Sequence, residues 1–122
     1  MTLSTSDQYC LDEVRRLDHD RYLTALLLPA AARSDVLALY AFSLEVARTR
    51  EIVSEPILGQ IRLQWWRETL EGIYAETPRE HPVVEALATA CQRNQLDGGA
   101  LEALVNAREA DMEDTPPSDL AA

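Results

Sequence analysis

The stretch of residues 34–53 is the feature that most constrains how this chain can fold. Between Val36 and Leu44 the only polar residue is Ser43. At about 100° per residue, a helix built from this stretch therefore has no side left for water. Helices of this kind are buried all round. We predict a central helix that other helices enclose.

The last turns of this predicted helix carry charged residues between Arg48 and Glu51. Charges on a buried helix must be paired or must face a cavity, because an isolated charge in the interior is costly. Tyr40, Leu44, Ala47 and Glu51 follow one another at spacings of four, three and four, which places them on one stripe of the helix. We expect this stripe to face a functional cavity.

Composition and charge limit the classes of protein to which this chain can belong. The chain has 122 residues, of which 47% are hydrophobic, enough for a single domain over residues 1–122 with a buried core. Four glycines and the lack of Val/Ile/Thr alternation predict an all-α fold. The formal net charge of −10 argues against nucleic acid as a partner, because phosphate binding needs clustered Lys and Arg. The chain contains arginine but no lysine, which indicates a GC-rich genome and an expected bacterial source.

The cysteines and the N-terminal residues suggest a cytoplasmic protein. Cys10 and Cys91 are isolated and show no CxxC spacing, so neither a zinc site nor a disulfide framework is predicted. The first ten residues lack the basic and apolar regions of a secretion signal. The longest apolar run, residues 22–32, is about half the length of a membrane span and is interrupted by Pro29.

Turn residues divide the chain into predicted helices over residues 6–17, 18–28, 30–53, 56–75, 82–94 and 98–114. Pro29, Pro56 and Pro82 suit first helical turns, where the missing N–H is not needed. Nearby residues that are candidate caps or turn residues are Ser34, Ser54 and His81. Residues 118–122 resemble the cap and first turn of a further helix.

The predicted helix over residues 56–75 has an apolar arc of about 260°, so we expect neighbours to wrap it. Arg62 falls in the middle of that arc, where an unpaired guanidinium would be costly. One interpretation is an ion pair, for which the carboxylate candidates are Glu45, Glu51 and Glu55. The alternative is that Arg62 binds a ligand. The ion pair is the favoured interpretation.

Other residues that could carry chemistry have simpler explanations. A group near the end of the chain resembles a metal cluster: Glu109, Asp111, Glu113 and Asp114. One helix cannot direct all four to one point, which favours a solvated acidic end. His19 and His81 lack a convincing Ser or Cys partner, and His81 before Pro82 suits a turn. Trp65 and Trp66 are more typical of a core than of a stacking platform.

Three blocks of the sequence, residues 26–42, 61–87 and 109–114, resemble the squalene and phytoene synthases, which join prenyl diphosphates head to head. The first block reads LLLPAAARSDVLALYAF and the second contains IRLQWWRETLEGIYAETPREHPVVEAL. The resemblance implies an isoprenoid-synthase-type helical bundle, of which this chain matches the N-terminal half. A second aspartate-rich motif is then expected in a C-terminal half.

The resemblance also shows where this chain departs from catalytic members. Their central helix carries an arginine and a DxxxD motif, which align with Leu44 and with Ala47 to Glu51. Their substrate-binding Ser-Phe pair aligns with Asp20 and Arg21. Mg²⁺ requires several oxygen ligands, so Glu51 alone is a weak metal candidate. The family-aligned substrate-pocket positions are Tyr40, Leu44, Ala47, Glu51 and Arg62.

Two functions from different classes follow. One is a Mg²⁺-dependent prenyltransferase that condenses two prenyl diphosphates. The other is a non-catalytic relative, because the patterns AF-x-x-E, VSE and R-x-Q-x-W resemble members described as assembly factors for respiratory complex I. The matching residues are Ala41, Phe42, Glu45, Val53, Ser54, Glu55, Arg62, Gln64 and Trp66. We prefer the second.

The non-catalytic interpretation implies no catalytic residue and no cofactor. It implies an apolar cavity for a prenyl chain, another lipid or a subunit of the respiratory complex. Peripheral association with the inner membrane and self-association are compatible with it.

Overall fold

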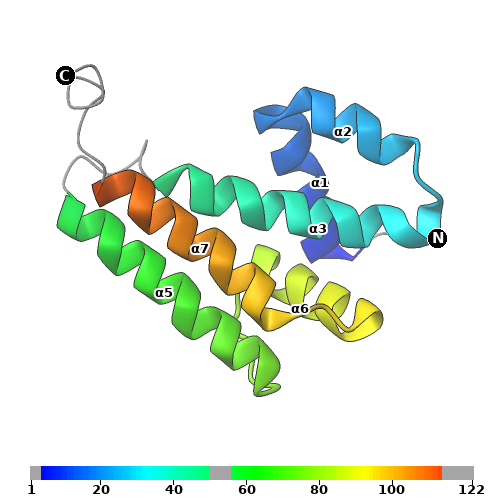
Figure 1. The fold of residues 1–122 in the computed structure, drawn as a ribbon. Coiled ribbons are helices and arrows are strands. Elements are labelled where there is room, and N and C mark those ends of the chain that lie inside the picture. Colours follow the sequence, from blue (N-terminus) through cyan, green and yellow to red (C-terminus); the bar gives the residue numbers. More distant parts are fainter. Residues whose placement is uncertain (1–3, 50–55, 114–122) are drawn as a thin grey trace.

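The computed structural model describes residues 4–49 and 56–113, and helices make up nearly all of these two ranges (Figure 1). The helices are α1 (Thr5–Leu17), α2 (His19–Leu26), α3 (Ala30–Ala47), α5 (Pro56–Tyr74), α6 (Pro82–Asn94) and α7 (Gly98–Glu113). The predicted all-α class is confirmed. The predicted helix beginning at residue 118 lies outside the described residues.

The central helix is α3, which packs against α1, α2, α6 and α7. In Figure 1 it runs across the middle of the molecule, with α1 and α2 on one side and α5 and α7 on the other. Every residue of the range 32–49 is at least partly buried. Its most enclosed face consists of Ala38, Ala41, Phe42 and Val46. This confirms the enclosed helix predicted from the apolar stretch, although α3 itself ends at Ala47.

A buried carboxylate joins α3 to the end of α6. Asp35 is only 6% exposed. It accepts hydrogen bonds from Arg93 Nη1 and from Asn94 Nδ2, each at 2.9 Å. Charge-assisted hydrogen bonds satisfy a carboxylate that would otherwise be costly to bury. They therefore fix where the C-terminal turn of α6 docks on α3.

Helices α5 and α7 form a second packed pair, held by Arg67. Its Nε and Nη2 donate to Asn106 Oδ1 at 2.9 and 2.8 Å, and Nη2 also pairs with Glu109. Glu109 is thus a bridge between two helices, so the expected solvated acidic end is wrong for this residue. The side chains of the other three acidic residues in that group lie outside the described part.

The expectation that neighbours wrap α5 is wrong. Its buried side includes Leu63, Trp66 and Leu70. Ile57 and Ile61 are 58% and 60% exposed, respectively. Among the described residues, α6, α7 and the contacts from α3 cover less than the full apolar arc, so part of it remains open. An apolar arc predicts which residues can be buried but not whether a partner is present.

Two of the predicted turn residues have different outcomes. His81 occupies the N-cap of α6, where its Nδ1 accepts a hydrogen bond from the Val83 backbone N–H at 3.1 Å. This confirms the interpretation of His81 as a turn residue. Ser34 lies inside α3 and caps nothing, because Pro29 already occupies the N-cap position. Within the described residues, no helix is long and apolar enough to cross a membrane.

Candidate functional site

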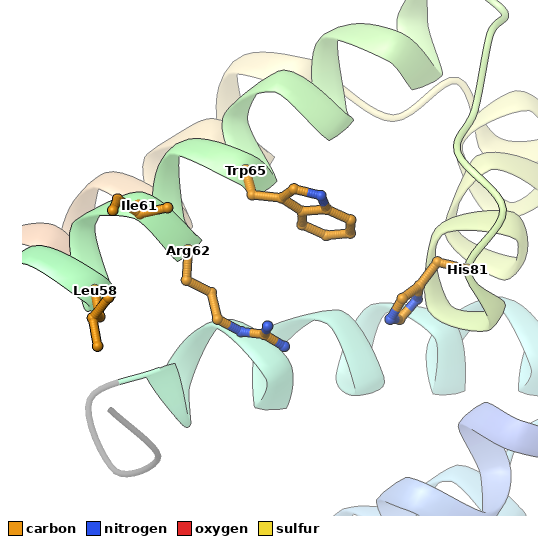
Figure 2. Close-up of a pocket in the computed structure, with 5 residues that line it drawn as sticks. All are labelled: Leu58, Ile61, Arg62, Trp65 and His81. Carbon is orange, nitrogen blue, oxygen red and sulfur yellow. The ribbon is translucent and has the colours of Figure 1, made fainter. Parts of the chain in front are cut away.

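A pocket of about 460 Å³ lies along α5, next to the start of α6. The side chains that line it are Leu58, Ile61, Arg62, Trp65 and His81. Figure 2 shows Arg62 extending from α5 toward α3, the Trp65 ring projecting from the same helix, and His81 at the opposite end of the opening. The volume is in the range of about 300–1,000 Å³ typical of small-molecule sites.

Trp65 forms one wall of this pocket and packs against buried aromatic side chains. Its ring meets the ring of Trp66 edge-on, with 4.9 Å between centroids. Trp66 is fully buried and packs edge-on against Phe42 of α3 at 5.3 Å. The Arg79 guanidinium lies over the Trp65 ring, 5.1 Å from its centroid. The prediction of a core role is therefore confirmed for Trp66, whereas Trp65 is only partly buried and faces the pocket.

Arg62 supplies the positive charge of the pocket. Its Nη2 lies 3.5 Å from Glu45 Oε2 on α3, which identifies the carboxylate partner among the three predicted candidates. The other two candidates lie outside the described residues. The Arg62 side chain is 41% exposed, so its position in the apolar arc gives only partial burial among the described residues. Its Nε is nevertheless enclosed and has no hydrogen-bond partner among the described residues.

His81 contributes a hydrogen-bond donor. Because Nδ1 accepts from Val83, that nitrogen carries no proton, and the neutral ring must carry its proton on Nε2. The imidazole ring lies 5.8 Å from the Trp65 ring between centroids. Capping of α6 therefore fixes both the position and the tautomer of a group that lines the pocket.

The predicted stripe on α3 lies elsewhere. Tyr40 faces α2, where the Arg21 guanidinium is 5.2 Å from the centre of its ring. Leu44 and Ala47 share its side of the helix and are partly exposed. Glu45 is displaced from Tyr40 by about 140° around the helix axis. The structure thus separates Arg62 from Tyr40, Leu44 and Ala47, and none of these three lines the α5 pocket. Glu51 lies outside the described residues.

The described part of this stripe does not fit a magnesium site. Leu44 and Ala47 carry no oxygen in their side chains, and Mg²⁺ needs an octahedral set of oxygen ligands. Asp20, at the aligned position on α2, is exposed at the surface. In the described ranges, no three His, Cys, Asp or Glu side chains come close enough to share a metal ion.

A smaller cavity of about 320 Å³ lies between the ends of α5 and α6, where Tyr74 and Cys91 meet. The Tyr74 hydroxyl donates to the Leu96 carbonyl at 2.7 Å and approaches Cys91 Sγ at 3.6 Å. Burial raises the pKa of the Tyr74 phenol and of the Cys91 thiol. Burial likewise raises the pKa of Cys10 to about 12. Neutral buried thiols are poor nucleophiles, so these groups are structural.

Sequence reasoning missed Leu58, Ile61 and His81 as residues of a common pocket. It treated the first two as buried and the third as a turn residue. The available signal was Arg62 in the middle of an apolar arc, together with Trp65 on the following turn. The contribution of His81 depends on the path of the chain after α5, which no local pattern gives.

Comparison with known proteins gives a consistent result. The family model of squalene/phytoene synthase matches residues 14–122. The chain is 41% identical over 109 residues to NADH dehydrogenase (ubiquinone) complex I, assembly factor 6, from Homo sapiens, covering 89% of this chain and 33% of the relative. The Bos taurus protein of that name is 39% identical, covering 91% and 33%. A Drosophila melanogaster homolog is 30% identical, covering 84% and 32%.

The chain therefore spans about a third of the length of the curated relatives it matches. These relatives are animal proteins and give no support to the expected bacterial source. No solved structure matches the chain significantly. The family match covers nearly the whole sequence and agrees with the all-α fold. The chain belongs to the squalene/phytoene synthase family.

Proposed function

We propose that this protein supports the assembly of respiratory complex I and does not condense prenyl diphosphates. The observation that carries the proposal is the combination of 41% identity to a relative named as a complex I assembly factor with an altered α3 stripe. Leu44 and Ala47 present hydrocarbon at the positions where catalytic members of the family carry arginine and aspartate.

The altered stripe matters because of what diphosphate chemistry needs. Departure of a diphosphate builds negative charge, which preorganised cations must stabilise in the transition state. Arg21, which contacts this stripe at the Tyr40 ring, already pairs with Asp18 at 3.3 Å. An apolar stripe suits contact with a hydrocarbon chain or a partner helix better than contact with a diphosphate. The partner we propose is a subunit of complex I, met at the surface of the inner membrane.

Deletion of the gene in its source organism tests the proposal. We expect a lower amount of assembled complex I on native gels and lower NADH:quinone oxidoreductase activity. Both should return with the unmodified gene, while citrate synthase activity should stay constant as a control. Normal complex I in the deletion strain would contradict the proposal.

A second assay tests the prenyltransferase alternative directly. The purified full gene product is incubated with farnesyl or geranylgeranyl diphosphate and Mg²⁺, and diphosphate and extractable hydrocarbon are measured. We expect neither product above the level without protein. Release that depends on the protein and stops on chelation of Mg²⁺ would establish the enzyme instead.

A further inference from the structure

The pocket along α5 has apolar walls that no described helix covers. Leu58 and Ile61 are 48% and 60% exposed, and together with Trp65 they line one continuous opening. Large apolar side chains that remain open to water around a concave site favour a ligand that removes them from water. The body of such a ligand must itself be apolar.

The polar side-chain groups of the pocket are all donors. Arg62 has only N–H groups, the indole of Trp65 has a single N–H, and the free nitrogen of His81 carries a proton because Nδ1 is occupied by Val83. None of these groups can accept a hydrogen bond from a ligand. A complementary ligand therefore offers acceptor oxygens rather than hydroxyl or amino donors.

The charge of the pocket favours a neutral ligand. Glu45 already balances Arg62 at 3.5 Å, and its side chain is the more buried of the two. The Arg79 guanidinium lies over the Trp65 ring, 5.1 Å from its centroid, but Arg79 does not line the pocket. A carboxylate or phosphate in the pocket would place a second negative charge near the Arg62–Glu45 pair, on a chain with a net charge of −10. A carbonyl oxygen can accept from Arg62 without that cost.

The arrangement of the donors favours a flat ligand. In Figure 2, Arg62 and His81 point toward one another from opposite ends of the opening, and the Trp65 ring lies between them on the side of α5. The two donors come from different elements, α5 and the N-cap of α6. A planar ring beside Trp65 with a carbonyl at each end would offer one acceptor to each donor.

We propose that this pocket binds a neutral, flat, apolar compound with carbonyl oxygens on opposite sides of a ring, the chemistry of a quinone. Arg62 and His81 donate to the two carbonyls, while Leu58, Ile61 and Trp65 contact the ring and its substituents. This inference does not rest on the proposed function. It concerns a site on α5, separate from the Tyr40 stripe on α3.

The test is titration of the purified full gene product with decylubiquinone, followed by calorimetry and by quenching of tryptophan fluorescence. We expect saturable binding of one molecule per chain. The reduced quinol, which has hydroxyl donors, should bind at least about threefold more weakly, as expected for one poorer hydrogen bond. Dodecanoate should also bind more weakly, because its negative charge would lie near Glu45.

Two pocket variants and one control locate the site. Ile61→Lys places a charge on the apolar wall at an exposed position and should weaken binding at least about tenfold. His81→Asn keeps a good N-cap residue but loses the Nε2 donor, and should weaken binding roughly three- to tenfold with α6 intact by circular dichroism. Leu23→Lys, at a 47% exposed leucine on α2, should leave binding unchanged.

Three results would overturn the proposal. The first is the absence of saturable quinone binding. The second is quinone binding that neither Ile61→Lys nor His81→Asn weakens. The third is tighter binding of dodecanoate than of the quinone, which would show that the pocket selects an anion.

Discussion

Glu45 is the more deeply buried member of its ion pair with Arg62, with 14% of its side chain exposed against 41% for Arg62. The two residues connect α3 and α5. From the sequence we would expect the loss of the carboxylate to be the more damaging change, because Arg62 is predicted to be buried. The observed burial reverses that expectation, because removal of Arg62 leaves the more buried charge, that of Glu45, without a partner.

We therefore predict that Arg62→Met lowers the free energy of unfolding by about 1–3 kcal/mol, between the values for exposed and fully buried pairs. Glu45→Gln should cost less, because Arg62 can turn toward water. The double variant Glu45→Met/Arg62→Met should be close to the unmodified protein. Urea denaturation measures all three. A larger loss for Glu45→Gln than for Arg62→Met would contradict the prediction.

Much of the fold follows from the sequence because its signals are local. The apolar stretch around Phe42 predicted the enclosed α3, and prolines and glycines placed the other helix ends within two residues of their positions. The end of α3 is the exception, because it was predicted at residue 53 and lies at Ala47. Exposure of Ile61 was not predictable, because it depends on which other helices are present. The candidate pocket was missed for a related reason. It combines Arg62 with His81, which lie on different elements and meet only in the folded chain.

Asp35 should be one of the most sensitive polar positions, because it is buried and accepts from both Arg93 and Asn94. We predict that Asp35→Ala lowers the free energy of unfolding by about 1–3 kcal/mol, and that Asp35→Asn, which keeps one acceptor oxygen, costs less. Thermal and urea unfolding would measure the change. Asp12→Ala is the control, since Asp12 pairs with Arg15 at the surface and should matter little. Equal effects of Asp35→Ala and Asp12→Ala would refute the buried-link interpretation.

The two glycines at the start of α7 should respond in opposite ways to substitution by alanine. A Cβ on Gly98 would lie 3.0 Å from Cε2 of Tyr74, whose hydroxyl is held by the Leu96 carbonyl. A Cβ on Gly99 would lie 3.4 Å from Asp97 Oδ1, an ordinary contact. We predict a loss of about 1–2 kcal/mol for Gly98→Ala from overpacking and a gain of roughly 0.5 kcal/mol for Gly99→Ala. Matched urea titrations would show the difference, and equal stability of the two variants would argue against the close packing of α7 on Tyr74.

The two cysteines should be unreactive in the folded protein. Cys10 is fully buried and Cys91 is 5% exposed. Burial raises the pKa of Cys10 from 9.0 to about 12, and the nearby charges of Asp7 and Glu13 act in the same direction. Thiol reagents attack the thiolate. At pH 8 we expect Ellman's reagent to label neither residue in native protein and both in urea, and fast labelling without urea would contradict the observed burial.

The same shift predicts how stability depends on pH. Below pH 9.0 the Cys10 thiol is neutral in both the folded and the unfolded state, so it contributes no pH dependence. Between pH 9.0 and about 12 the unfolded chain releases this proton and the folded chain does not, so the free energy of unfolding must fall as the pH rises. We predict that Cys10→Ala, although less stable at pH 7 because it leaves a small cavity, loses less stability between pH 8 and pH 10.5 than the unmodified protein does. Urea denaturation at a series of pH values measures how steeply the free energy of unfolding of each protein falls with pH.

Cys91→Ala serves as the comparison. The hydrogen bond from Tyr74 partly offsets the rise in the pKa of Cys91, so removal of the Cys91 thiol should change this slope less. Identical slopes for the unmodified protein and Cys10→Ala would show that Cys10 ionises alike in the folded and unfolded chain.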